Sequence, residues 1–261
     1  MGDAALRLTD VGVTRDGRDI LGPVDWVVAP DERWVVLGPN GSGKSTMVKI
    51  ASLQLHPSRG EVEVLGEVLG RTDVRKLRER VGYAAAALAD MLRPTITARD
   101  VVMTARHAAL EPWWHQYDDA DRAEALHRLA RLGVAHLADR EFGTLSSGER
   151  QRVLVARTLM GDIGLVLLDE PNAGLDVGGR EWLVGGLDDL AADVATPAMV
   201  LVTHHVEEIP PSFTHAALLR DGRFQAAGPI EETLTADSLS ATFGLSLQME
   251  RRGGRWTAWA S

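Results

Sequence analysis

The segment "GPNGSGKS", residues 38–45, has the residue types and spacing of a loop that binds phosphate. Small residues let successive backbone N–H groups point inward at phosphate oxygens, and a helix that follows directly presents the positive end of its dipole to them. In such a loop Lys44 reaches the β- and γ-phosphates of a nucleotide, and the Ser45 hydroxyl binds Mg²⁺. The residues expected to contact the nucleotide here are Gly38, Asn40, Gly41, Ser42, Gly43, Lys44, Ser45 and Thr46.

Two adjacent carboxylates, Asp169 and Glu170, end the apolar segment "LVLLDE". Such a pair at the end of a buried strand is costly unless a cation or a proton-transfer task uses it. We expect Asp169 to hold Mg²⁺ through its water shell and Glu170 to polarise the attacking water. A strand that simply ends at the surface in acidic residues is the alternative, and the phosphate loop upstream argues against it.

A second apolar segment, "MVLVTHH", also ends in polar side chains. Ligands of open α/β sheets bind at the carboxyl ends of the strands, so His204 is expected near the γ-phosphate. A lone histidine is more often structural, but this position favours a functional role. The expected catalytic residues are therefore Lys44, Glu170 and His204.

Another glycine-containing segment, "TLSSGERQRV", starts at Thr144 and precedes a charged stretch of helical character. Ser146 in this position is expected to cap the helix. The N-terminus of a helix attracts anions, so Ser146 and Gly148 form a second candidate phosphate site. An isolated segment of this kind is usually a helix cap and nothing more, so the open question is which phosphate it would bind.

The elements around these motifs indicate an α/β protein with a mainly parallel sheet. Residues 6–37 read as short strands broken by turns, which predicts a β-rich N-terminal region. The apolar runs at 164–170 and 198–205 alternate with helical patterns at 45–53 and 178–193. Continuous apolar strands between helices are typical of a parallel sheet covered on both faces.

The middle and the end of the chain differ from this pattern. Between about Asp73 and Val155 the sequence is rich in Ala, Arg, Glu and Leu, which predicts a helical insertion. In the helix expected to end at Gly133, the buried stripe is predicted to be Ala123, Leu126, Leu129 and Ala130. The last residues alternate apolar and polar side chains around Gly253 and Gly254, which predicts a hairpin.

Composition excludes several classes of protein. The 261 residues are 45% hydrophobic and 25% charged, which is typical of a folded globular chain. A net charge of -9 argues against broad binding to nucleic acid or anionic lipid, and the lack of cysteine excludes disulfides and thiolate chemistry. The first ten residues lack the features of a secretory signal, and no apolar run approaches the roughly 20 residues of a membrane helix. Any membrane role is expected to depend on another chain.

Taken with the phosphate loop, the segment at 145–149 resembles the signature of the ATP-binding subunits of ABC transporters, a Leu-Ser-Gly-Gly-Gln stretch. Leu145, Ser146 and Gly148 match it, whereas Ser147 and Glu149 replace a glycine and a glutamine. Three further motifs follow the family in order: "LVLLDE", then "NAGLD" with Asp176 as the D-loop, and then His204 as the switch histidine. The resemblance covers nearly the whole chain.

This resemblance implies a P-loop NTPase (RecA-like) core with a mainly parallel sheet, an N-terminal antiparallel β region and an inserted α-helical subdomain. A single domain is expected, with its core at about 1–83 and 156–229, the helical subdomain at about 84–155, and a hairpin-like tail at about 230–261. ATP and Mg²⁺ are the implied cofactors. Two subunits, expected to form a homodimer, would close head to tail around two MgATP, so that Ser146 and Gly148 serve the ATP of the partner. Asp176 of the D-loop is expected to be a further nucleotide-binding residue.

The family further implies transmembrane permease partners, a cytoplasmic location at the inner face of the membrane, and no nucleic acid. The general run of residues 201–223, "LVTHHVEEIPPSFTHAALLRDGR", resembles ATPases of bacterial metal or iron-chelate uptake. Two rival interpretations stay open: an ATP-gated regulatory module with slow hydrolysis, and a DNA-associated ABC ATPase. The acidic charge balance and the lack of coiled-coil heptads argue against the second.

The chain departs from the family pattern at two functional positions. Ala86 aligns with the glutamine of the Q-loop, and a methyl group cannot bind Mg²⁺ or water; Gln54 or Asp90 is the alternative group for that task. Arg15 falls near the aromatic residue that stacks on adenine, and a guanidinium can stack in its place. We therefore predict that Arg15 contacts the base.

The dipeptide Trp113-Trp114 lies in the predicted helical insertion, where the family docks its membrane subunits. An exposed pair would suit such an interface. A buried structural pair is the alternative, because tryptophan is usually mostly buried.

Overall fold

The N-terminal part of the chain folds as an antiparallel sheet. A computed structural model describes residues 4–261; residues 1–3, which the expected core segment includes, lie outside the described residues. The sheet has the strand order β2-β1-β4-β5. Its strands are β1 (Leu6–Arg15), β2 (Arg18–Val28), β4 (Arg59–Val64) and β5 (Glu67–Val68). This confirms the expected N-terminal antiparallel region.

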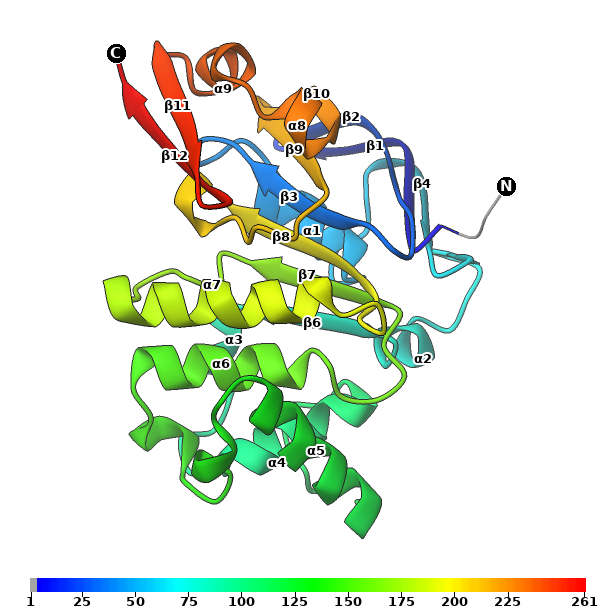
Figure 1. The fold of residues 1–261 in the computed structure, drawn as a ribbon. Coiled ribbons are helices and arrows are strands. Elements are labelled where there is room, and N and C mark those ends of the chain that lie inside the picture. The colour runs from blue at the N-terminus through cyan, green and yellow to red at the C-terminus, as the bar shows by residue number, and fades with distance from the viewer. Residues whose placement is uncertain (1–3) are drawn as a thin grey trace.

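A six-stranded sheet of order β10-β9-β3-β8-β7-β6 forms the centre of the protein (Figure 1). Its strands are β3 (Arg33–Leu37), β6 (Val81–Ala85), β7 (Leu165–Asp169), β8 (Ala198–Thr203), β9 (His215–Arg220) and β10 (Arg223–Pro229). Neighbours pair in parallel except β9 and β10. Every residue of β3, β7 and β8 is buried, as expected for strands covered on both faces.

The register of the parallel strands brings the predicted chemistry to one edge. Leu37 of β3 pairs with Thr203 of β8, and Asp169 of β7 pairs with both Val202 and Ala85. All of these residues lie at the carboxyl ends of their strands. The polar residues that follow the strands therefore meet at one edge of the sheet, where ligands of such sheets bind.

Helices cover the sheet and extend past its β6 edge (Figure 1). Those beside the sheet are α1 (Lys44–Ala51), α2 (Val74–Arg78) and α7 (Val177–Ala192). The helical layer beyond the edge contains α3 (Ala86–Met91), α4 (Ala98–Met103), the 3-10 turn η1 (Thr104–His107), α5 (Asp119–Arg131) and α6 (Ser147–Arg157). The expected limits of the helical insertion, 84 and 155, fall inside β6 and α6.

The predicted buried stripe of α5 is wrong in three of its four positions. Only Leu129 is buried, whereas Leu126 is 43% exposed and both alanines face solvent. The buried positions are Asp121, Ala125 and Leu129, four residues apart. Asp121 occupies an inward position because Arg106 pairs with its carboxylate at 2.7 Å. A prediction based on the spacing of apolar residues cannot identify a buried position that is occupied by an acidic residue.

The C-terminal part contains more than the expected hairpin. Two short helices, α8 (Ile230–Thr233) and α9 (Ala236–Phe243), come before β11 (Leu247–Arg252) and β12 (Arg255–Ala260). The strands pair around the Gly253-Gly254 turn, as predicted. Across the described chain, 4–261, we find no helix whose length and hydropathy would let it cross a membrane.

Candidate functional site

The segment 38–45 lies between the end of β3 and the start of α1, as the strand, loop and helix order predicted. Gly43 caps α1 with φ 103°, a backbone conformation that glycine adopts without strain. The loop surrounds a cavity of about 220 Å³. The residues that line it are Ile20, Asn40, Gly41, Ser42, Gly43, Lys44, Ser45, Thr46 and Glu170.

Gly38 does not line this cavity but lies just before it, packed against the main chain of β9. A Cβ at this position would be 2.0 Å from the Leu219 carbonyl oxygen, so any side chain here would force β3 and β9 apart.

We expect Gly38→Ala to lower the free energy of unfolding by about 1–3 kcal/mol, the usual cost of overpacking. Gly185→Ala is the matched control, since a Cβ there meets no atom within 4 Å in the middle of α7. That control should gain up to about 1 kcal/mol from the higher helix propensity of alanine. Urea unfolding measures both, and equal stability of the two variants would refute the close approach at Gly38.

Lys44 is directed into its own loop. Its ammonium donates hydrogen bonds to the carbonyl oxygens of Gly38 (2.8 Å) and Pro39 (3.0 Å), and the residue is only 4% exposed. Burial lowers the pKa of Lys44, and the nearby carboxylates of Glu170 and Asp169 oppose this. The charge is thus held in a poorly solvated place beside two acids, where an anionic ligand gains from it.

Ser45 and Asp169 meet as the Mg²⁺ interpretation requires. The Ser45 hydroxyl donates to Asp169 Oδ1 at 3.1 Å, and Asp169 is buried. Burial raises the pKa of Asp169, and the hydrogen bond from Ser45 opposes that rise. Among residues 4–261 there is no cluster of three or more His, Cys, Asp or Glu side chains suited to a metal. Two oxygen ligands fit Mg²⁺ when nucleotide phosphates and waters complete its shell.

Glu170 and His204 also lie together, although they come from different strands. His204 Nδ1 is 3.2 Å from Glu170 Oε1, and both side chains are about one-third exposed. Glu170 has φ 50°, an uncommon conformation for a residue other than glycine, and its N–H donates to the Val202 carbonyl. The strained backbone aims the carboxylate at the cavity of the phosphate loop, which it lines.

A second concavity, of about 370 Å³, lies at the N-termini of α6 and α7. It brings together the signature residues Ser146 and Gly148 with the D-loop residue Asp176. Ser146 caps α6, and Asp176 caps α7. The side chain of Asp176 accepts a hydrogen bond from Gly179 N at 2.7 Å. The two concavities share no lining residue. Each therefore presents half of the chemistry expected around a nucleotide.

Several residues that line these concavities were not predicted as site residues, among them Glu149, Trp182 and Ile20. Glu149 closes a capping box, since its carboxylate accepts from Ser146 N at 2.8 Å; the spacing Ser-x-x-Glu is a signal for it. Hydrogen bonding by Ser146 lowers the pKa of the Glu149 carboxyl group. Trp182 lines the second concavity and Ile20 lines the first, and neither position carries a sequence signal.

Arg15 is not among the residues that line the phosphate-loop cavity. It is exposed at the end of β1, opposite Arg18 of β2. From the same hairpin, Ile20 lines the cavity instead. Stacking of Arg15 on adenine therefore stays a prediction, which unchanged ATP affinity of Arg15→Ala would contradict.

Ala86 begins α3 directly after β6. Because Ala85 pairs with Asp169, Ala86 follows the sheet edge beside Glu170. Both alternative residues, Gln54 and Asp90, are exposed, and of the two only Gln54 lines the groove beside this edge. Tyr83 lies beside Gln54 in the same groove. Its partial burial, together with the negative charge of Asp169, raises the pKa of the Tyr83 phenol to about 12.

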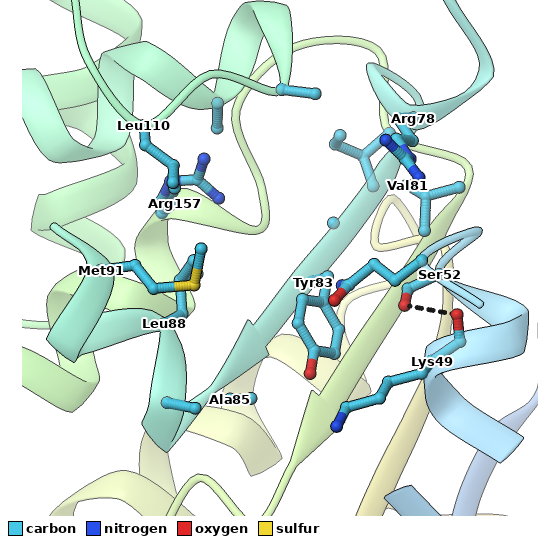
Figure 2. Close-up of a pocket in the computed structure, with 16 residues that line it drawn as sticks. Lys49, Ser52, Arg78, Val81, Tyr83, Ala85, Leu88, Met91, Leu110 and Arg157 are labelled. Carbon is cyan, nitrogen blue, oxygen red and sulfur yellow. Dashed lines mark hydrogen bonds between the residues drawn. The ribbon is translucent and has the colours of Figure 1, made fainter. Parts of the chain in front are cut away.

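The groove, of about 450 Å³, separates the central sheet from the helical layer (Figure 2). Lys49, Ser52 and Tyr83 face Leu88, Leu110 and Arg157 across it. Its lining includes three basic side chains, those of Lys49, Arg78 and Arg157, and no acidic one among the described residues. Arg157 is buried, which lowers its pKa to about 10. The groove is thus a basic, largely apolar depression in an acidic protein.

The tryptophan pair is exposed, by 58% at Trp113 and 86% at Trp114. The structure thus excludes the buried alternative. The Arg93 guanidinium lies 4.1 Å from the centre of the Trp113 ring. The pair lies between η1 and α5, in the helical layer.

The chain resembles known proteins in sequence and in structure. A profile of the family described as ABC transporter matches residues 21–173. An uncharacterized ABC transporter ATP-binding protein, YlmA of Bacillus subtilis (strain 168), is 38% identical over 239 residues, which are 91% of this chain and 90% of that protein. The hemin import ATP-binding protein HmuV of Nocardia farcinica (strain IFM 10152) is 35% identical over 93% of this chain and 83% of its own.

Among solved structures, a dimeric post-hydrolysis state of the ATP-binding cassette MJ0796 bound to ADP and Pi superimposes with a TM-score of 0.74. The superposition covers 86% of this chain and 98% of the MJ0796 chain, and the two sequences are 24% identical. The likeness confirms the expected P-loop α/β fold.

Proposed function

Because the chain belongs to the ABC transporter family as an ATP-binding, ATP-hydrolysing subunit, we propose that two copies close head to tail around two MgATP and so move separate membrane-spanning subunits. The separation of the two concavities carries this proposal. The phosphate-loop cavity holds Lys44, Ser45 and Glu170, whereas Ser146 and Asp176 line a different concavity of the same chain. A symmetric pair brings the second concavity of each copy to the first of the other.

In the closed pair, the residues of this chain would act by position and charge. Lys44 and the loop N–H groups would bind the β- and γ-phosphates, and Ser45 with Asp169 would hold Mg²⁺, which would supply positive charge to neutralise the phosphates. Glu170 orients the attacking water and accepts its proton, while His204 fixes the carboxylate through their 3.2 Å contact. Ser146 of the partner's α6 would direct a helix N-terminus at the γ-phosphate.

The basic groove suits the membrane partner. It lies between the central sheet and the helical layer, so a segment seated in it contacts Gln54 and Tyr83 on one side and Leu88 on the other. The three cations in it form no ion pair with any carboxylate of residues 4–261, which favours an acidic, partly apolar segment. Such binding supports the proposal that the subunit lies at the inner face of the membrane, bound through its partners.

We expect Arg78→Glu to weaken co-purification with the membrane subunits encoded by neighbouring genes, because it reverses one of the groove charges. Lys76→Glu, on the exposed side of α2, is the matched control. Phosphate release by the isolated chain should be the same in both. Equal co-purification of both variants would place the partner elsewhere.

The cargo proposed is a metal or iron chelate taken up by the cell, in line with the hemin import protein among the relatives. Reconstitution with the membrane subunits in vesicles tests this. Hemin should stimulate phosphate release there, and no response to hemin or to other iron chelates would refute the cargo.

Ala86 favours a second candidate function, an ATP-gated switch in which closure is the signal and hydrolysis resets it slowly. With alanine at position 86, the sheet edge beside Glu170 lacks the glutamine side-chain amide that, in the resembled family, links this edge to the membrane subunit. Mg²⁺-dependent phosphate release by wild type and Ala86→Gln separates the two. Robust wild-type turnover, changed little by Ala86→Gln, supports the transport motor; slow turnover that Ala86→Gln restores supports the switch.

A further inference from the structure

The C-terminal hairpin of β11 and β12 lies beside the segment that follows β8 (Figure 1). We call residues 203–208 the switch segment; it holds the end of β8, His204, and the 3-10 turn η4 (Val206–Glu208). Trp256 of the hairpin is 8% exposed and belongs to the main core. Close packing of Gly254 on Pro211 fixes the turn next to the same region. The hairpin is therefore a fixed part of the fold.

Arg255 connects three parts of the protein from this hairpin. Its Nη1 donates to Glu181 Oε2 at 2.7 Å and its Nη2 to Glu181 Oε1 at 3.3 Å, a two-pronged ion pair. Nη2 also donates to the main-chain carbonyl of Glu207. A further contact joins Ala258 N to Glu207 Oε1 at 3.5 Å. One guanidinium thus binds α7 and η4 at the same time.

The two elements that Arg255 joins, α7 and η4, directly follow the loops that hold the proposed site residues Asp176 and His204. Glu181 lies five residues after Asp176, the N-cap of α7. Glu207 lies three residues after His204, and the next residue, Glu208, accepts a hydrogen bond from the Thr203 hydroxyl. A displacement of η4 is therefore passed on to His204 and its contact with Glu170.

We propose that Arg255 is a positioning residue for hydrolysis, which holds the switch segment against α7 so that His204 stays in place at Glu170. The inference rests on the proposed function, because it takes His204 and Glu170 as the groups beside the attacking water. The proposed role of Arg255 is limited to the position of His204 relative to Glu170.

Arg255 differs from an ordinary surface ion pair, which contributes little. One of its acceptors is a backbone carbonyl, and its guanidinium binds two separate elements at once. Paired guanidinium and carboxylate groups with two parallel hydrogen bonds fix direction as well as distance. The hydrogen bond from Arg255 also lowers the pKa of Glu181, which favours the carboxylate form that accepts both hydrogen bonds.

Arg255→Ala is the test, with Arg251→Ala as the matched control. Arg251 lies on the same hairpin, pairs with Glu231 and stacks 4.9 Å from the centre of Trp256, but it has no contact with α7 or η4 among the described hydrogen bonds and ion pairs. Arg255→Ala should lower kcat by about tenfold, less than the roughly 100-fold that a 1 Å misplacement can cost. The Kd for ATP should change by less than about twofold, because no binding group is lost.

The partner residue gives a second readout. Glu181→Ala should lower kcat less, and adding it to Arg255→Ala should lower kcat no further, since both act through one contact. Hydrogen exchange in a peptide spanning 203–208 should become faster in Arg255→Ala and stay unchanged in Arg251→Ala.

Two results would overturn the proposal: unchanged kcat and unchanged exchange in Arg255→Ala, or equal losses in Arg251→Ala, which would point to general loosening of the hairpin. Failure of the proposed function looks different, because then wild type itself releases no phosphate, or Glu170→Gln releases it at the wild-type rate. In that case the exchange measurement still decides whether Arg255 holds the switch segment.

Discussion

Glu170→Gln is expected to bind ATP, remain closed as a dimer and hydrolyse almost nothing. The amide has the size of the carboxylate but cannot accept the proton of the attacking water. General base catalysis contributes about 10²–10⁴-fold, so kcat should fall by at least about 100-fold. Glu170 is about one-third exposed, and within residues 4–261 its side chain hydrogen-bonds only His204, so the fold should tolerate the change.

Phosphate release and dimer content in MgATP measure this result side by side. Glu232→Gln, on the exposed side of α8, is the matched control and should behave as wild type. Hydrolysis by Glu170→Gln at the wild-type rate would remove Glu170 from the catalytic role. A slow variant that fails to form a dimer would separate the role of the base from the proposed closure.

The second large effect is expected at Lys44. Lys44→Met keeps the length of the side chain and removes the charge that would bind the β- and γ-phosphates. A hydrogen bond to a charged group contributes about 1.5–3 kcal/mol, which corresponds to a Kd for MgATP roughly 10- to 100-fold weaker. Hydrolysis should be lost as well, because the same charge stabilises the transferred phosphoryl group.

A fluorescent ATP analogue measures the Kd, and Lys76→Met on α2 is the control for loss of a surface lysine. The thermal midpoint is needed too, because Lys44 donates to two loop carbonyls that methionine leaves without a partner. ATP affinity equal to wild type would show that phosphate binding depends on the loop N–H groups alone.

Local motifs were predictable because their function depends on neighbours in the sequence. The spacing of 38–45 implies both the loop and the helix that follows, and the structure has the helix beginning at Lys44. Ends of apolar strands identified Asp169, Glu170 and His204, since parallel strands must end at a common edge. The register of β7 and β8 brings them together as expected.

Features that depend on pairing between distant residues were not predictable in this way. The stripe of α5 was wrong because Arg106 stabilises a buried Asp121. Ile20 of β2 lines the loop cavity although it lies more than 15 residues before the loop, and no motif in the sequence marks it. Arg255 and Glu181 are 74 residues apart, and neither belongs to a motif. The meeting of Ser146 with Asp176 followed from the family resemblance rather than from the residues themselves.

The central claim is that each nucleotide is enclosed by two chains, and mixing two inactive variants tests it most directly. Lys44→Met disables the phosphate loop. Ser146→Asp disables the second concavity: aspartate still caps α6 but repels the γ-phosphate. In a head-to-tail pair of the two variants, one site has both defects and the other has none.

Equal amounts of the two variants form mixed pairs about half of the time, and each mixed pair has one intact site of two. Phosphate release should therefore recover to about one quarter of wild type if the composite sites act independently. No recovery above the sum of the separate variants would mean that each chain completes its own site, which would contradict the account.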